Sequence, residues 1–109
     1  MTRPPMSRAA AALLRALMAR TGVERDRILL SEAHSTDWQS LTFTGEQHRL
    51  LLHLAGSEAE SACARLMDGL EDAEFSLPGH TVADIRAERR PGTDDRSIIV
   101  AVEALTIAE

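Results

Sequence analysis

Several residue types are missing or scarce in this chain of 109 residues, and each absence removes a class of function. Lysine and tyrosine are absent, only 3% of the residues are aromatic, and cysteine occurs once, at Cys63. A single cysteine cannot form an intramolecular disulfide or complete a cysteine-based metal site. A chain without disulfides is typical of a reducing compartment, so we expect a cytoplasmic protein.

The basic residues are all arginines, and they lie unevenly along an acidic chain. Residues 1–23 carry four arginines and no acid, whereas residues 24–109 carry seventeen acids against eight arginines, a net charge of −9. An acidic body without a basic stripe argues against nucleic acid or an anionic membrane surface as the main partner. No apolar run approaches the roughly 20 residues that a membrane-spanning helix needs.

The length of the chain is that of one domain with a single small core. With so few aromatic residues, that core must be built from leucine, isoleucine, valine, methionine and alanine. Residues 1–5 contain two consecutive prolines and little that could anchor them, which predicts a flexible N-terminal tail. We therefore expect a single domain over residues 6–109.

The first predicted helix follows this tail. Apolar residues recur at helical spacing from Ala10 to Met18, with Ser7 as a suitable N-cap and Gly22 as a suitable C-terminal residue. The alternative is a targeting peptide, because the segment is rich in alanine and free of acids. Arg15 interrupts the apolar stretch that a secretory signal would need, which favours the structural helix.

A second helix is predicted from Ser57 onward. Ser57 and Glu60 have the spacing of a capping box, and apolar residues recur at helical spacing from Ala59 to Leu70. The helix should end within residues 71–74, before a Pro-Gly turn. Cys63 lies on the apolar stripe, where cysteine behaves as a small buried hydrophobe rather than as a nucleophile.

Residues 37–56, between the two helices, predict a β-hairpin because apolar and polar side chains alternate in both arms. A two-residue turn at Thr44 and Gly45 places Leu41 and Phe43 on one face with the leucines of the second arm, which are Leu50, Leu52 and Leu54. The same register places Trp38 opposite Leu51 on the other, largely polar face. If the helices cover the leucine face, that other face stays open.

Three further strands complete the predicted sheet. They span residues 27–34, 81–90 and 97–108. The last is apolar on both faces, as in a central strand or in a strand with one face covered by a partner. Whether residues 27–43 form one bent strand or two strands stays open at this point. The fold class is therefore α+β: two helices packed on one face of an antiparallel sheet of about four strands, in the order α-β-β-α-β-β.

The favoured function is a non-catalytic protein-interaction or self-assembly module that uses the open sheet face. A tryptophan–leucine pair on a polar face is typical of an interface. The candidate interaction face consists of Trp38, Ser40, Arg49, Leu51 and His53. We expect a homodimer or a complex with another protein.

Two alternatives belong to other functional classes. A small-molecule binder or small enzyme would gather His34, Asp37 and His53 in a cleft beside the hairpin. An acidic chaperone or inhibitor would present the negative body to a basic partner. No two histidines have the spacing of a metal-site motif, and no glycine-rich loop is present, so we expect no metal and no cofactor.

Overall fold

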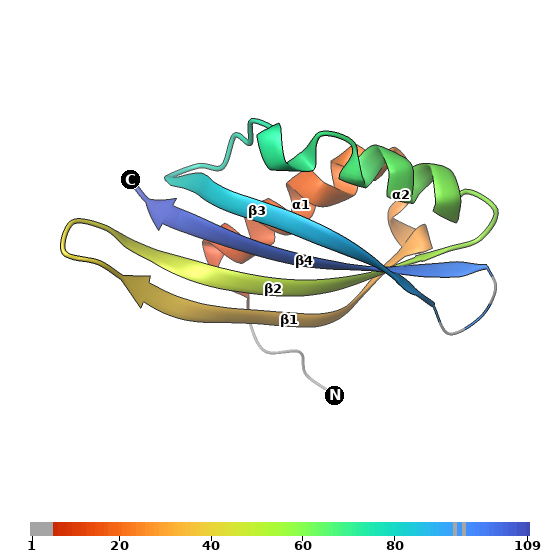
Figure 1. Cartoon of the computed structure of the whole chain (residues 1–109), viewed down its shortest axis with the longest axis horizontal. Helices are drawn as coiled ribbons and strands as arrows, with labels where there is room; N and C mark the ends of the chain where they lie inside the picture. The colour runs from red at the N-terminus through yellow and green to blue at the C-terminus, as the bar shows by residue number, and fades with distance from the viewer. Residues whose placement is uncertain (1–5, 93, 95) are drawn as a thin grey trace.

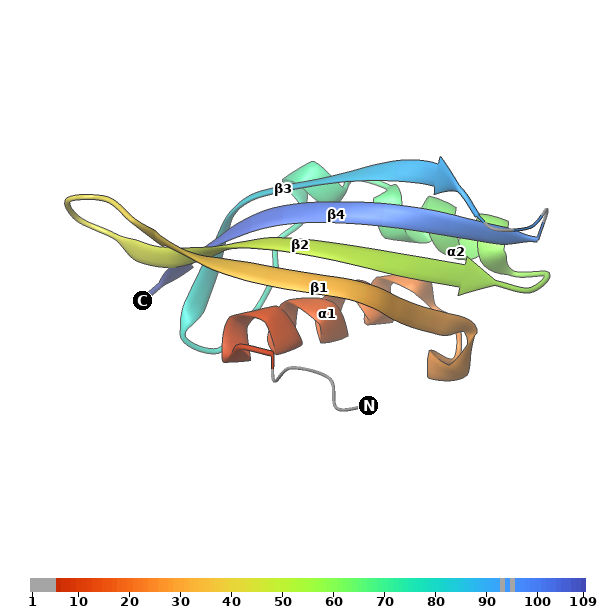
Figure 2. The same cartoon turned by 90° about the horizontal axis from the view of Figure 1, so that it is seen from below.

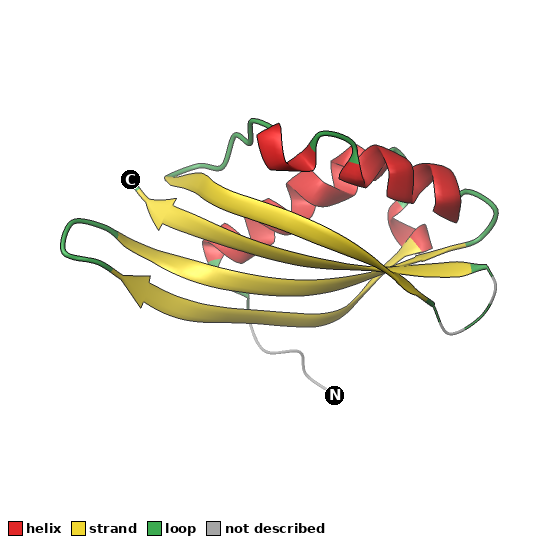
Figure 3. Ribbon diagram, in the orientation of Figure 1, coloured by secondary structure: helices red, strands yellow, loops and turns green. Residues whose placement is uncertain are grey.

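In a computed structural model that describes residues 6–92, 94 and 96–109, two helices lie against one face of a four-stranded antiparallel sheet (Figures 1 and 3). The order of the elements is α-β-β-α-β-β, apart from two short 3-10 turns. The predicted fold class is therefore confirmed. The predicted flexible tail, residues 1–5, lies outside the described residues. Within the described part of the chain, no helix is both long and apolar enough to span a bilayer.

Helix α1 spans Arg8–Thr21 and begins and ends as the sequence predicts. The hydroxyl oxygen of Ser7 accepts a hydrogen bond from the backbone N–H of Ala10 at 3.1 Å, which satisfies one of the free donors of the first turn. Gly22 ends the helix with a φ of 71°, a conformation that favours glycine. A 3-10 turn at Arg25–Arg27 then leads into the sheet.

Helix α2 spans Ala59–Met67 and differs at both ends from the prediction. The expected capping box is wrong: the N-cap residue is Glu58, and no side chain caps the helix. The carboxylate of Glu60 instead accepts two hydrogen bonds from Arg89, at 2.6 and 2.8 Å, so it is engaged away from the backbone N–H of Ser57. The helix ends at Met67, because Gly69 adopts a φ of 62° and starts a 3-10 turn at Leu70–Asp72.

The sheet consists of four strands of twelve residues each: β1 (Ile28–Gln39), β2 (Thr44–Ala55), β3 (His80–Pro91) and β4 (Ser97–Ala108). Their order is β1-β2-β4-β3, so the strand predicted to be central lies in the middle of the sheet. The question left open about residues 27–43 also has an answer: a single strand, β1, extends to Gln39. Its register shifts between Leu30 and Glu32, as at a β-bulge.

The hairpin between β1 and β2 exists, but its predicted turn is wrong. The loop is Ser40–Phe43, and Thr44 pairs with Gln39 as the first residue of β2. Leu41 is fully exposed and Phe43 is more than half exposed, so neither joins the leucine face. Gly45 lies within strand β2 rather than in the turn. A larger residue would not fit there, because a Cβ at this position would collide with the carbonyl oxygen of Thr106 on β4.

The core lies between the helices and one face of the sheet (Figure 2). Alternate residues of β2 and β4 point into it, and Leu50, Leu52, Val100 and Val102 are completely buried there. Both helices contribute fully buried leucines, among them Leu13 and Leu66. We call this the covered face of the sheet.

Candidate functional site

Within the described residues, both helices lie on the covered side, and we call the opposite face of the sheet the open face (Figure 2). Strand register places on it every second residue of each strand. Its principal members are Leu29, Glu32, His34, Thr36 and Trp38 from β1; Gln47, Arg49, Leu51 and His53 from β2; Ile99, Ala101, Glu103, Leu105 and Ile107 from β4; and Thr81, Asp84, Arg86, Glu88 and Arg90 from β3.

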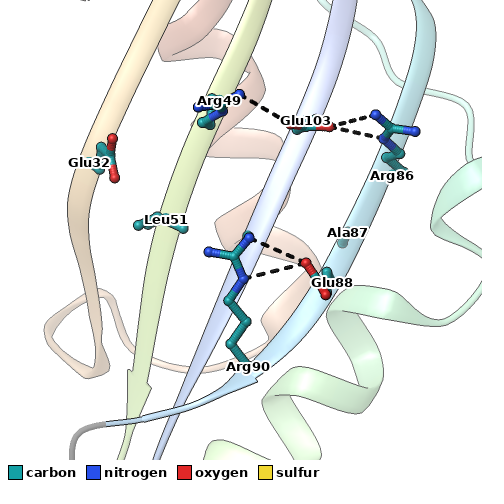
Figure 4. A pocket seen from close by; sticks show the side chains of 9 residues that line it. Glu32, Arg49, Leu51, Arg86, Ala87, Glu88, Arg90 and Glu103 are labelled. Carbon is teal, nitrogen blue, oxygen red and sulfur yellow. Dashed lines mark hydrogen bonds and ion pairs between the residues drawn. The ribbon is translucent and has the colours of Figure 1, made fainter.

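A row of charges crosses the middle of the open face (Figure 4). Glu103 on β4 forms ion pairs with Arg86 at 2.8 Å on one side and with Arg49 at 3.6 Å on the other. The hydrogen bond from Arg86 lowers the pKa of Glu103, and the same bond raises the pKa of Arg86. All three side chains are well exposed, so the row adds little to stability and instead gives the face a polar centre.

Apolar side chains lie beside this charged row. Leu51 and Ala101 lie at one side of it, and Leu105 and Ile107 lie at the other side on β4. A shallow groove of about 590 Å³ runs across the four strands, with Glu32, Leu51, Ala101 and Glu88 among its lining residues (Figure 4). The hollow is open and is lined by both apolar and paired charged groups, which distinguishes it from an enclosed ligand pocket.

The residues of the predicted interaction face lie in different parts of the hairpin. Arg49, Leu51 and His53 follow one another along β2 on the open face. Trp38 is half-buried on the same face, but the residue opposite it on β2 is Gly45. Leu51 lies opposite Glu32 of β1. The predicted Trp38–Leu51 pair is therefore wrong, because the four-residue loop shifts the register.

Ser40 does not belong to the open face at all. It begins the loop, where its hydroxyl oxygen accepts a hydrogen bond from the backbone N–H of Phe43 at 3.0 Å. Its own N–H donates to the carbonyl oxygen of Phe43 at 2.9 Å. Ser40 therefore shapes the loop and contributes nothing to the sheet surface.

The alternative cleft of His34, Asp37 and His53 is not assembled. His34 lies opposite Arg49 on the open face, and His53 lies four residues further along β2, opposite Leu29. Asp37 is three residues from His34 in β1, and an odd spacing along a strand places the two side chains on opposite faces. Asp37 therefore points to the covered face. The strand register therefore separates these three side chains.

Sequence reasoning missed a buried hydrogen-bond network on the covered face. His48 is 2% exposed, and its ring nitrogens contact the hydroxyl oxygens of Ser35 and Thr106, each at 2.8 Å. Burial lowers the pKa of His48, nearby His80 lowers it further, and Glu46 opposes the shift. His48 is two residues from Leu50 in β2, so the sequence alone places both on the same buried face. Its two hydroxyl partners depend on strand pairing that local sequence does not reveal.

The single thiol and the possible metal ligands are the other groups that could carry chemistry. Cys63 is buried on the core side of α2, and burial raises the pKa of its thiol, which disfavours the reactive thiolate. Among the residues that the structure describes, no three histidine, cysteine, aspartate or glutamate side chains are grouped closely enough to hold a metal ion.

Comparisons with known proteins place the chain in a family. A comparison with curated protein sequences found no match. A chain in the solved structure of the virion of a native gene transfer agent particle has a similar fold, with a TM-score of 0.52 and 20% sequence identity over 93% of this chain and 92% of that one. The sequence pattern of the family described as Tail completion protein gp17 matches residues 6–106. Because this match covers nearly the whole chain, the protein belongs to the tail completion protein gp17 family.

Proposed function

We propose that this protein is a non-catalytic structural component of a phage-like particle, in which it helps to complete the tail by binding other proteins. The observation that carries the proposal is the family match over residues 6–106, which includes both helices and nearly all of the sheet. The fold shared with a chain of a gene transfer agent virion is in keeping with it.

The open face supports a role in assembly. A four-stranded sheet normally buries one face, and here the other face presents apolar residues around a paired charged centre. Such a surface combines apolar area for affinity with charges that select the correct orientation of a partner. Arg49, Leu51 and His53 are the residues on which we expect binding to depend, with Trp38 at the far end of the same face.

We further propose that contacts on this face include contacts between copies of the chain. The strands carry charges of both signs side by side, so the face has complementary groups for a second copy. A homodimer is the simplest product of such self-association.

Removing the gene from its source and imaging the particles by electron microscopy tests the role in the particle. We expect particles with incomplete or unjoined tails, and we expect mass spectrometry to detect the chain in purified wild-type particles. Complete particles that lack the chain would contradict the proposal.

Reintroducing variants then tests the face. Leu51→Arg places a charge on the open face and should fail to restore complete particles. Ala64→Arg is the matched control, because it adds the same side chain at an exposed position of α2 on the other side of the sheet. If Leu51→Arg restores particles as well as Ala64→Arg does, the open face is not the binding surface.

A further inference from the structure

Two arginines join the C-terminal ends of the two helices. The carbonyl oxygens of the last turn of a helix have no partner within it, and they form the negative end of its dipole. Nε of Arg65 in α2 donates to the carbonyl oxygen of Thr21, the last residue of α1, at 2.7 Å. Nε and Nη2 of Arg20 in α1 donate to the carbonyl oxygens of Leu66 and Asp68, where α2 ends. Each helix therefore has its negative end capped by a cation of the other helix.

A third arginine ties the beginning of α2 to the sheet. Arg89 on β3 forms an ion pair with Glu60 in the first turn of α2, at 2.6 Å. Both side chains are well exposed, so water can replace this pair at small cost. We call Arg20, Arg65 and Arg89 the latch, because together they tie both ends of α2 to other elements.

The apolar contribution of α2 to the core is small. Its buried residues are Ala59, Ala62, Cys63 and Leu66, and only the last of these has a large side chain. The helix has nine residues and no side-chain N-cap, whereas an isolated helix needs roughly 12–15 residues to be even marginally stable in water. Helix α1 has fourteen residues and is capped at both ends. We therefore expect α2 to depend on the latch more than α1 does.

The segment that carries α2 begins and ends at a glycine turn. Gly56 follows β2 with a φ of 88°, and Gly69 precedes the 3-10 turn η2 with a φ of 62°. Leu70, the next residue, is buried and anchors the chain to the core. We call residues 56–69 the α2 segment (Figure 1). Because the backbone turns at both of its ends, this segment can move while the strands on either side stay paired.

We propose that the α2 segment is a latched lid, which opens about Gly56 and Gly69 while α1 and the sheet stay folded. Local opening is expected where few large apolar side chains are buried and the other contacts are exposed polar ones. Opening would break the contacts of the latch and uncover Cys63, which is buried in the closed form. The lid gives the protein a second conformation, in which part of its core is accessible from outside.

The single cysteine of the chain reports on this opening without any added probe. Labelling of the full chain with a maleimide, in increasing concentrations of urea, gives the fraction of time for which Cys63 is accessible. The free energy of global unfolding is measured on the same protein. We expect wild type to be labelled at least about tenfold faster than global unfolding allows. The rate should depend only weakly on urea, because a local opening exposes little surface.

Loss of a latch residue should speed the labelling of Cys63. Arg89→Gln removes an exposed ion pair, and we expect an increase of about threefold. Arg20→Gln removes two charged hydrogen bonds at a half-buried position, and we expect an increase of at least about tenfold. Burial raises the pKa of the Cys63 thiol and Arg89 opposes this shift, so loss of Arg89 alone would slow the thiolate reaction. Faster labelling of Arg89→Gln therefore reports opening.

Arg86→Gln is the matched control. It removes an ion pair of the same kind, with Glu103, from the same strand β3, but it leaves the latch intact. Cys63 should be labelled in this variant as in wild type. Both arginines of β3 are exposed, so neither variant should disturb the fold.

Two results would each overturn the inference. The first is labelling of wild type that follows global unfolding at every concentration of urea. The second is labelling of Arg20→Gln and Arg89→Gln that rises no more than their loss of global stability explains. Neither result bears on the proposed role in a particle, because the lid is a property of the isolated chain and the two ideas can fail separately.

Discussion

The two faces of the sheet are built from alternate residues of the same strands, yet they have different chemistry. On the covered face, Leu50 and Leu52 are completely buried, and the buried His48 has both ring nitrogens hydrogen bonded. On the open face, Arg49 and Leu51 occupy the intervening positions and keep contact with solvent. The difference indicates that the covered face supplies most of the stability of the fold, and the proposed assembly role falls to the open face.

The sharpest test of this division uses two adjacent leucines of β2. Leu52→Ala removes a completely buried side chain and should lower the free energy of unfolding by about 2–5 kcal/mol. Leu51→Ala changes a half-buried residue on the open face and should cost less than about 1.5 kcal/mol. Chemical denaturation of both variants measures the difference. Equal losses would mean that the two faces contribute alike to the fold.

Gly45 is the position at which this simple division should fail. Although its neighbours across the sheet belong to the open face, a Cβ there would collide with the carbonyl oxygen of Thr106. Gly45→Ala should therefore destabilise the protein by about 1–3 kcal/mol, as overpacking does. Gln47→Ala, at the next open-face position of β2, is the control and should change stability little. Tolerance of Gly45→Ala would argue against the pairing of Gly45 with β4.

The buried histidine should make the covered face sensitive to acid. Because the pKa of His48 is lower in the folded protein than its usual value of about 6.5, the unfolded chain binds the proton more readily. The stability that neutral His48 contributes is complete above about pH 6.5 and is lost as the pH falls toward the folded pKa. The expected slope is at most about 1.4 kcal/mol per pH unit, the limit for one proton.

A variant that cannot titrate isolates this effect from that of the carboxylates. His48→Gln should be less stable at neutral pH, but its stability should decline less between about pH 6.5 and 5.5. Denaturation curves of both proteins across this range give the comparison. Parallel declines would show that another group is responsible.

The features that could be predicted from sequence are those determined by residues close together in the chain. The caps of α1 at Ser7 and Gly22 are local, and both were predicted correctly. The apolar, β-branched run of β4 predicted the observed bounds, Ser97–Ala108, and a central position was one of the two interpretations it allowed.

The features that could not be predicted depend on contacts between distant segments. Glu60 fits a local capping box, but Arg89 on β3 takes its carboxylate. Gly45 is typical of a turn, but its role depends on the close backbone of β4. The wrong turn placed Leu41 and Phe43 in the core and Trp38 opposite Leu51.

For the candidate site, the alternation of side chains along β2 was enough to assign Arg49, Leu51 and His53 to one face. The charged row and the His48 network could not be predicted in this way, because they depend on the order of the strands in the sheet.

The most direct test of the central claim compares labelling of the open face in the free protein and in the particle. The native Cys63 is buried and should react slowly with a maleimide, so an added surface cysteine can be followed on its own. Gln47→Cys reports on the open face, and Ser61→Cys reports on an exposed position of α2. We predict that Gln47→Cys is labelled quickly in the free chain and protected in assembled particles, while Ser61→Cys stays reactive in both. Labelling of Gln47→Cys at the same rate in both states would contradict the claim that the open face is the assembly surface.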